Sequence, residues 1–179
     1  MTNLSRAARI YLIATYVTGA LGLVASWWLS AGRAPLAPLL VWAFAATASA
    51  PFRIHLPVFG KISIAFTFVF AALIQAGAFA AALAAGLAGL AASLLRRPAA
   101  RPPLHRTLFN SAELILSTLA AGAALRLGGA GPGEFDPAAG WLPVLLATGV
   151  FFSVNTCLVS GAISLTAGVP VISTWARHF

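Results

Sequence analysis

Four polar residues in the C-terminal half of the chain could bind a ligand or exchange a proton. Asn110, Glu113 and Ser117 stand at positions i, i+3 and i+7, so a helix would place them on one face. Asn155 lies in a later apolar stretch and could face them. Glu113 falls inside an apolar stretch, and an ionisable group in lipid normally faces a protein interior or a wet cavity. Two interpretations stay open: this polar face lines a ligand pocket or relays a proton, or Glu113 fixes the helix register through a hydrogen bond.

The other reactive side chains are not spaced for catalysis or metal binding. His55, His105 and His178 lie in separate segments without the HExxH spacing of zinc proteases, and no acidic cluster completes a metal site. Glu134 and Asp136 share a loop rich in Gly and Pro, which is typical of a solvated turn. No glycine-rich phosphate loop follows a strand, and no strand is expected. We therefore predict that the protein is not an enzyme and carries no catalytic residue, metal or cofactor.

The composition requires an apolar environment for these residues. Of the 179 residues, 60% are hydrophobic and 8% are charged, with a mean hydropathy of +0.94. A soluble domain averages about 25% charged residues, so this chain cannot cover a water-facing surface. The net charge of +8 comes from arginines at the ends of apolar stretches, where they set topology and meet lipid headgroups. The predicted partner is therefore the lipid bilayer, and nucleic acid is not expected.

The apolar stretches predict an all-α, polytopic protein with a single transmembrane domain over residues 1–179. The predicted spans are approximately 9–30, 34–51, 62–76, 78–95, 107–127 and 141–166. Residues 62–95 carry no charge and as one helix would reach roughly 50 Å at about 1.5 Å per residue, against a hydrocarbon core of about 30 Å. A break at Gln75-Ala76-Gly77 would divide this stretch and give six spans.

The basic residues agree with this break and predict the orientation. With six spans, one side of the membrane receives nine arginines and lysines and the other side two. The nine are Arg6, Arg9, Arg53, Lys61, Arg96, Arg97, Arg101, Arg106 and Arg177, and the two are Arg33 and Arg126. Trp27, Trp28 and Trp141 fall at the opposite interface, where indole rings concentrate. Because basic residues gather on the cytoplasmic side, we expect a multi-pass protein of the bacterial inner (cytoplasmic) membrane with both termini cytoplasmic.

Small residues recur every four positions in three of the predicted helices and favour close helix packing. They are Ala14, Thr18, Gly22 and Ser26 in the first span, Gly86 with Ala78 and Ala82 in the fourth, and Gly149 and Gly161 with Ser153 and Cys157 in the sixth. Packing within the bundle and contact with a partner protein both stay open, and the chain could also associate with copies of itself.

One family resemblance covers most of residues 6–179. The stretch from Pro51, PFRIHLPVFGKISIAFTFVFAALIQAGAFAAALAAGLAGLAASLLRR, resembles the membrane-embedded N-terminal sensor region of bacterial HD-GYP-type signalling proteins. The segments RTLFNSAELILSTLAAG and FFSVNTCLVSGAISLTAGVPVISTW look like the next two helices of that region. The matching motifs are Phe109-Asn110, Val154-Asn155-Thr156 and Trp175. In such proteins this module precedes a cytoplasmic phosphodiesterase that acts on cyclic di-GMP.

The chain departs from that family at its C-terminal side. The relatives continue past the counterpart of Trp175 into a further helix and an output domain, whereas this sequence stops at Phe179. It has no HD dyad and no GYP motif, so the catalytic activity is not carried over. The resemblance implies a non-catalytic sensor that transduces a signal through a cytoplasmic output domain or protein partner outside this chain.

A second resemblance gives the alternative function. Pro57, Gly60, Ile62 and Ser63, with the stripe from Ala14 to Ser26, look like the substrate-binding S-component of energy-coupling-factor vitamin transporters. That likeness implies an S-component-like bundle of six helices whose first helix meets the transport subunit. The sensor resemblance is closer in the last two helices, so the sensor is the first prediction and the transporter subunit the second.

Overall fold

The computed structural model describes residues 4–30, 36–56, 60–96, 99, 101–134, 136 and 141–178, and within them the protein is helical apart from one short hairpin. The helices are α1 (Arg6–Ser30), α2 (Leu36–Ser49), α3 (Ala65–Ala76), α4 (Ala78–Leu94), α5 (Leu104–Leu127), α6 (Leu142–Ala167) and α7 (Val171–His178). Strands β1 (Arg53–Leu56) and β2 (Gly60–Ser63) pair antiparallel, with Arg53 opposite Ser63.

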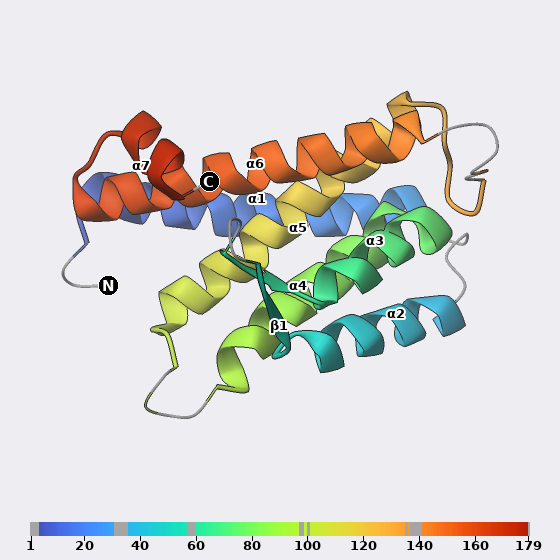
Figure 1. The fold of residues 1–179 in the computed structure, drawn as a ribbon, viewed down its shortest axis with the longest axis horizontal. Helices are drawn as coiled ribbons and strands as arrows, with labels where there is room; N and C mark the ends of the chain where they lie inside the picture. Colours follow the sequence, from blue (N-terminus) through green and yellow to red (C-terminus); the bar gives the residue numbers. More distant parts are fainter. Residues whose placement is uncertain are drawn as a thin grey trace.

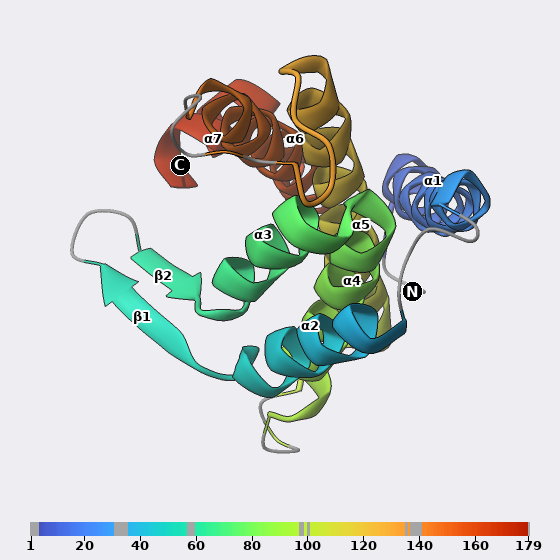
Figure 2. The same ribbon diagram turned by 90° about the vertical axis from the view of Figure 1, so that its right-hand side faces the viewer.

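The hairpin shows that the expectation of no strand was wrong. Residues 53–63 connect α2 to α3, and such a connection leaves backbone N–H and C=O groups without helical partners. Pairing β1 with β2 provides those partners. The hairpin projects to one side of the helices, next to α3 (Figure 2).

The six longer helices run in alternating directions along the chain (Figure 1). Helix α4 lies at the centre, in contact with α2, α3 and α5, while α5 also contacts α1 and α6 (Figure 2). Helix α7 turns back and packs along α6 (Figure 1).

The predicted break in residues 62–95 is confirmed at Gly77. Helix α3 ends at Ala76 and α4 begins at Ala78. Gly77 has φ 90° and ψ 178°, a conformation that L-residues with a side chain rarely adopt. This backbone reversal folds α3 and α4 against each other as neighbours (Figure 1).

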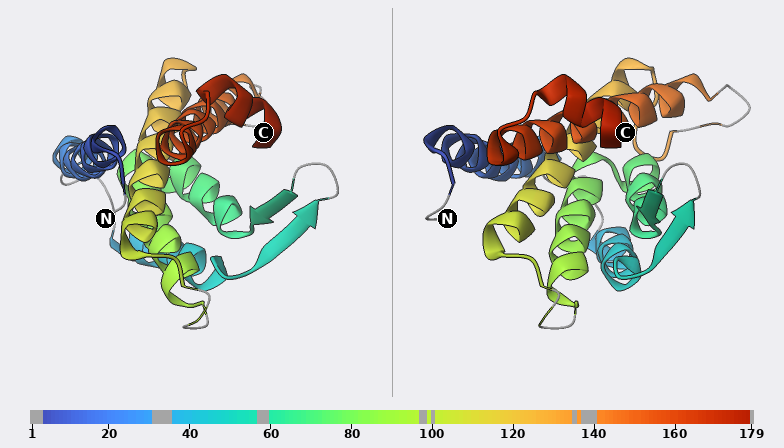
Figure 3. Two further views of the ribbon diagram at one scale, coloured as in Figure 1. Left: turned by 90° about the vertical axis from the view of Figure 1, so that its left-hand side faces the viewer. Right: turned by 60° about the vertical axis from the view of Figure 1, so that its left-hand side comes forward.

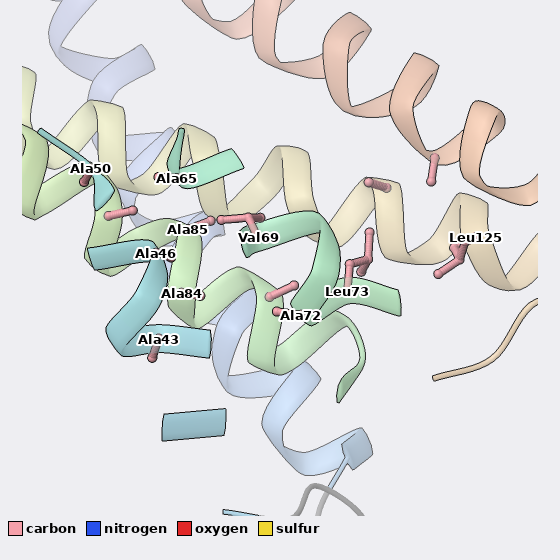
Figure 4. Close-up of a cluster of buried hydrophobic side chains, with 14 of the residues drawn as sticks. Ala43, Ala46, Ala50, Ala65, Val69, Ala72, Leu73, Ala84, Ala85 and Leu125 are labelled. Atoms are coloured by element: carbon pink, nitrogen blue, oxygen red, sulfur yellow. The ribbon is translucent and has the colours of Figure 1, made fainter. Parts of the chain in front are cut away.

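The core is built mainly from alanine (Figure 4). Its largest cluster joins α2, α3, α4 and α5, with Val69 and Leu73 among its few larger side chains. Helix α4 buries residues all around its circumference, including Ala80, Ala81 and Ala84 at 0% exposure. A helix covered on every side by others needs small side chains, because only these let several backbones approach it at once.

Three of the predicted packing glycines lie in tight contacts between helices, and a Cβ at the first, Gly22 of α1, would lie 2.9 Å from Leu119 Cδ1 of α5. A Cβ at Gly86 of α4 would lie 2.8 Å from Ile115 Cδ1 of α5, and one at Gly161 of α6 would lie 2.8 Å from the Tyr11 hydroxyl of α1. Gly149 differs, because it is exposed and has open space where its Cβ would be. Gly149 therefore does not pack within the bundle, and contact with a partner protein stays open for it.

Only half of the predicted stripe on α1 packs within the bundle. Gly22 and Ser26 are partly buried, whereas Ala14 and Thr18 point outward. Four residues advance a helix by about 400°, so a period-four stripe drifts about 40° at each step and leaves the contact face. The buried residues of α1 are instead spaced by three and four, at Ala8, Leu12, Thr15 and Gly19.

Among the described residues, three helices are long and apolar enough to cross a membrane, namely α1, α5 and α6. Helices α2, α3 and α4 have 14, 12 and 17 residues. At about 1.5 Å per residue they fall short of a hydrocarbon core of about 30 Å. The fold therefore fits a helical membrane protein with three helices of spanning length.

We expect Gly77→Ala to destabilise the protein by about 1–3 kcal/mol, because alanine is strained at this backbone conformation. Its Cβ would also lie 2.9 Å from Pro132 Cγ. Thermal unfolding of the purified protein in detergent measures the effect. The control is Gly149→Ala, which enters open space on a helix and should be neutral or stabilise by up to about 1 kcal/mol. Equal stability of the two variants would contradict this account of the break.

Candidate functional site

A cavity of about 900 Å³ lies where α3, α4, α5 and α6 meet the hairpin and the start of α1. Figure 3 shows these elements from two sides. The apolar lining of this cavity includes Phe66 and Val69 of α3, Leu114 of α5, and Val159 and Ile163 of α6. The polar lining of the cavity comes from residues within α5 and α6 and from the segments that connect the helices.

A buried polar contact in this cavity joins α5 to α6. Glu113 of α5 is only 5% exposed, and the Nδ2 amide of Asn155 donates a hydrogen bond to Glu113 Oε2 at 2.6 Å. Both residues line the cavity. The sequence placed Asn155 opposite the Glu113 face, and the structure brings the two side chains into direct contact.

The other two predicted residues have different environments. Asn110, one turn before Glu113, lines the same cavity but is exposed. Ser117 is fully buried, and its hydroxyl donates to the backbone carbonyl of Glu113 at 2.8 Å. A serine within a helix often bonds the carbonyl four residues back in this way. Ser117 therefore packs beneath Glu113 and is not part of the cavity lining.

Three arginines line the cavity at its exposed end: Arg53 of β1, Arg96 after α4, and Arg106 in the first turn of α5. Partial burial, together with the positive charge of Arg96, lowers the pKa of Arg53. The guanidinium of Arg96 also donates to the Ala92 carbonyl at 3.1 Å. Two like charges are thus held near each other at one edge of the cavity, which favours an anion beside them.

The same region holds the one histidine whose side chain the structure describes, His105, which lines the cavity. The side chains of His55 and His178 lie outside the described part. Among the described residues, no three His, Cys, Asp or Glu side chains come together to hold a metal ion.

A contact that the sequence analysis missed connects α6 to α7. The indole Nε1 of Trp175 donates to the Thr156 hydroxyl at 3.1 Å, and Thr174 is buried beside it. Thr156 directly follows Asn155, so two consecutive residues of α6 form hydrogen bonds with different helices. Asn155 bonds α5 and Thr156 bonds α7. The sequence carried a signal for α7, because Gly168 can end a helix and Pro170 precedes Val171, Ile172 and Trp175 at helical spacing. In the structure Gly168 has φ 69° and ends α6.

Two tyrosines of α1 were also missed as contact residues. The Tyr11 hydroxyl donates to the Leu158 carbonyl of α6 at 2.9 Å, and the Tyr16 hydroxyl donates to the His105 carbonyl of α5 at 2.7 Å. These bonds hold the first half of α1 against the helices that bound the cavity.

A second cavity of about 550 Å³ lies at the opposite end of the helices. Its lining comes from the end of α1, the α3–α4 turn and the segment after α5, and includes Ser30, Gly77, Arg126, Pro132 and Glu134. The Gly133 amide anchors this segment by donating to the Ile74 carbonyl at 2.7 Å. Residues 135 and 137–140 of the same loop lie outside the described part.

Comparison with protein-family models, with curated proteins and with solved structures finds no match to this chain. The comparisons therefore identify it neither as an HD-GYP sensor region nor as an S-component, and both resemblances stay predictions.

We expect Asn155→Leu to destabilise the protein by about 1–3 kcal/mol, because it leaves the buried Glu113 carboxyl without its amide partner. Glu113→Gln retains an acceptor for that amide and should cost less. Thermal unfolding in detergent measures both variants. The control is Ser153→Ala, on the exposed face of α6, which should have little effect. A neutral Asn155→Leu would show that the Glu113–Asn155 bond is not needed to join α5 to α6.

Proposed function

We propose that this chain is a non-catalytic membrane sensor, a signal-input module that acts through a cytoplasmic output domain or partner protein. The observation that carries the proposal is the pair of adjacent bonds on α6. Asn155 reaches the cavity and bonds Glu113, while Thr156 bonds Trp175 of α7. A change at the cavity therefore has a short physical route to the C-terminal helix.

The route works through the orientation of α6. Consecutive residues of a helix point about 100° apart, so Asn155 and Thr156 face different neighbours. A ligand that takes the Asn155 amide or the Glu113 carboxyl as its partner favours a different position of α6. Small helix shifts of about 1–2 Å are a common form of such transitions. Because α7 is short and packs on α6, α7 moves with α6. It thereby transmits the shift to any protein segment that contacts α7.

In this proposal the helices make six spans with both termini cytoplasmic, in the bacterial inner membrane. Alternating helix directions support this arrangement, as does the division of side chains between the two ends. One cavity is lined by Arg53, Arg96 and Arg106. The last turn of α1, near the other cavity, contains Trp27 and Trp28. The shorter α2, α3 and α4 pack among the other helices, where a membrane can thin locally around them at modest cost.

Accessibility labelling tests this topology. In a Cys157→Ser background, single cysteines at Ser30 and Glu134 should react with a membrane-impermeant maleimide added outside intact cells. A cysteine at Ala99 should react only after the cells are opened, because six spans place it on the cytoplasmic side. Labelling of the Ala99 position from outside would overturn the six-span arrangement.

A substrate-binding subunit of a vitamin transporter is the second candidate, and the second cavity favours it. That cavity lies beside the loop after α5 and the far ends of α1 and α3, where an outward-facing binding site would be expected. Calorimetric titration of the purified protein with a panel of vitamins separates the two functions. Tight binding of one vitamin, weakened by Glu134→Gln, would favour the transporter subunit over the sensor.

The sensor predicts that the Glu113–Asn155 contact controls the position of α7. Spin labels on cysteines at Ile172 and Leu104, both exposed, report the distance from α7 to the start of α5. In the Cys157→Ser background, Asn155→Leu should shift or broaden that distance distribution by about 2 Å. Thr156→Val, which removes the acceptor for Trp175, should do the same.

Two controls separate coupling from general loosening. Ser153→Ala changes the exposed face of α6 and should leave the distribution unchanged. Gly77→Ala destabilises the α3–α4 turn instead, so it should lower the unfolding temperature without moving α7. An α7 that is insensitive to Asn155→Leu, or equally sensitive to Gly77→Ala, would contradict the proposed route.

A further inference from the structure

In the part of the chain that the structure describes, the arginines of the larger cavity have no acidic partner. The chain contains three acidic side chains. Glu113 is buried and bonded to Asn155, while Glu134 lines the cavity at the other end and Asp136 follows it in sequence. Among the described residues, therefore, no carboxylate of this chain is placed to neutralise Arg53, Arg96 and Arg106 together. A cluster of like charges beside a cavity calls for an external anion.

The start of α5 adds to the positive potential. Pro103 occupies the N-cap and supplies no side-chain hydrogen bond to the first turn. Pro102, His105 and Arg106, around that turn, all line the cavity. The unpaired N–H groups and the dipole of a helix N-terminus attract anions, most of all phosphates. The first turn of α5 and the three arginines therefore both contribute positive electrostatic potential to the same cavity.

The rest of the cavity is suited to an apolar chain. Besides the arginines and the Glu113–Asn155 pair, its lining includes the apolar side chains Phe66, Val69, Leu114, Val159 and Ile163. Its volume of about 900 Å³ lies within the range of about 300–1,000 Å³ for small-molecule sites. An anionic group at one end with an apolar wall behind it matches an amphiphile in both charge and shape. Several arginine forks favour a phosphate, whose oxygens can accept from more than one guanidinium.

We infer that the cavity binds an amphiphile with a phosphate headgroup, held by Arg53, Arg96 and Arg106, with its apolar chain along α3, α5 and α6. This inference names the ligand of the proposed sensor and so rests on that function for its physiological meaning. The phosphate could belong to an anionic membrane lipid or to a soluble phosphate compound, and both present the same chemistry to the arginines.

Lipid retention by the full chain tests the inference. The protein, purified in detergent with equal amounts of phosphatidylglycerol and phosphatidylcholine, is analysed by native mass spectrometry. We expect one tightly held phosphatidylglycerol, and Arg53→Gln/Arg96→Gln should weaken its retention about tenfold through lost charge-assisted hydrogen bonds. The matched control, Arg6→Gln/Arg9→Gln, removes the same charge at the same end, but neither residue lines the cavity. Arg106→Gln provides a second variant if the double variant does not fold.

A soluble source is tested in parallel with inorganic pyrophosphate. If pyrophosphate raises the unfolding temperature of the wild type but not of Arg53→Gln/Arg96→Gln, and phosphatidylglycerol is not preferred, the arginines bind a soluble phosphate and the apolar chain along α3, α5 and α6 is overturned. Equal retention of the two lipids together with no pyrophosphate effect would overturn the whole inference. Equal weakening by Arg6→Gln/Arg9→Gln would overturn it too, since general headgroup attraction would then suffice.

The spin-label distance separates this inference from the proposed function. Phosphatidylglycerol that binds at the arginines but leaves α7 in place would support the ligand class and contradict the sensor. An α7 that responds to Asn155→Leu, in a protein that prefers neither phosphatidylglycerol nor pyrophosphate, would support the sensor and overturn the ligand class.

Discussion

Close packing of α4 against α5 is the contact on which the rest of the structure depends. Cβ atoms at Gly86 and Gly89 would lie 2.8 Å from Ile115 Cδ1 and 3.0 Å from Ser111 Cα. The Ser111 hydroxyl uses this proximity to donate to the Gly86 carbonyl at 2.7 Å. In lipid, helices gain little from hiding apolar surface, so such close contacts and hydrogen bonds must supply the association energy. Because α5 carries Glu113, the small residues of α4 also decide where the cavity forms.

The buried bond between Glu113 and Asn155 is the second constraint, and it depends on the first. A carboxyl that is 5% exposed needs a partner, and Asn155 can reach it only when α5 and α6 hold one register. The same bond explains why both interpretations of Glu113 remain compatible with the structure. If Glu113 fixes the register of α5 on α6 through this one hydrogen bond, a ligand that competes for the bond also changes that register.

The arginines bear on both the proposed topology and the inferred ligand. Basic residues at the cytoplasmic end are expected in any inner-membrane protein, so their number alone says little about a ligand. Position distinguishes them here: Arg53, Arg96 and Arg106 line one cavity, whereas Arg6 and Arg9 at the same end do not. The start of α5 lines the same cavity. These three arginines therefore form a local site of positive charge, in addition to any part that they have in membrane topology.

The sequence by itself determined the apolar character of the chain, the break at Gly77 and the shared helix face of Asn110, Glu113 and Ser117, whereas the contact of Glu113 with Asn155 needed the packing of α5 on α6. The first three follow from composition or from spacing within a single helix, which local geometry dictates. The hairpin, α7 and its bond from Trp175 to Thr156, and the gathering of three arginines at one cavity were decided by the tertiary structure. The stripe on α1 shows the physical reason. Spacing limits which residues can share a face, but only the neighbouring helices decide which face becomes the inner one, and so Thr15 and Gly19 are buried while Ala14 and Thr18 point outward.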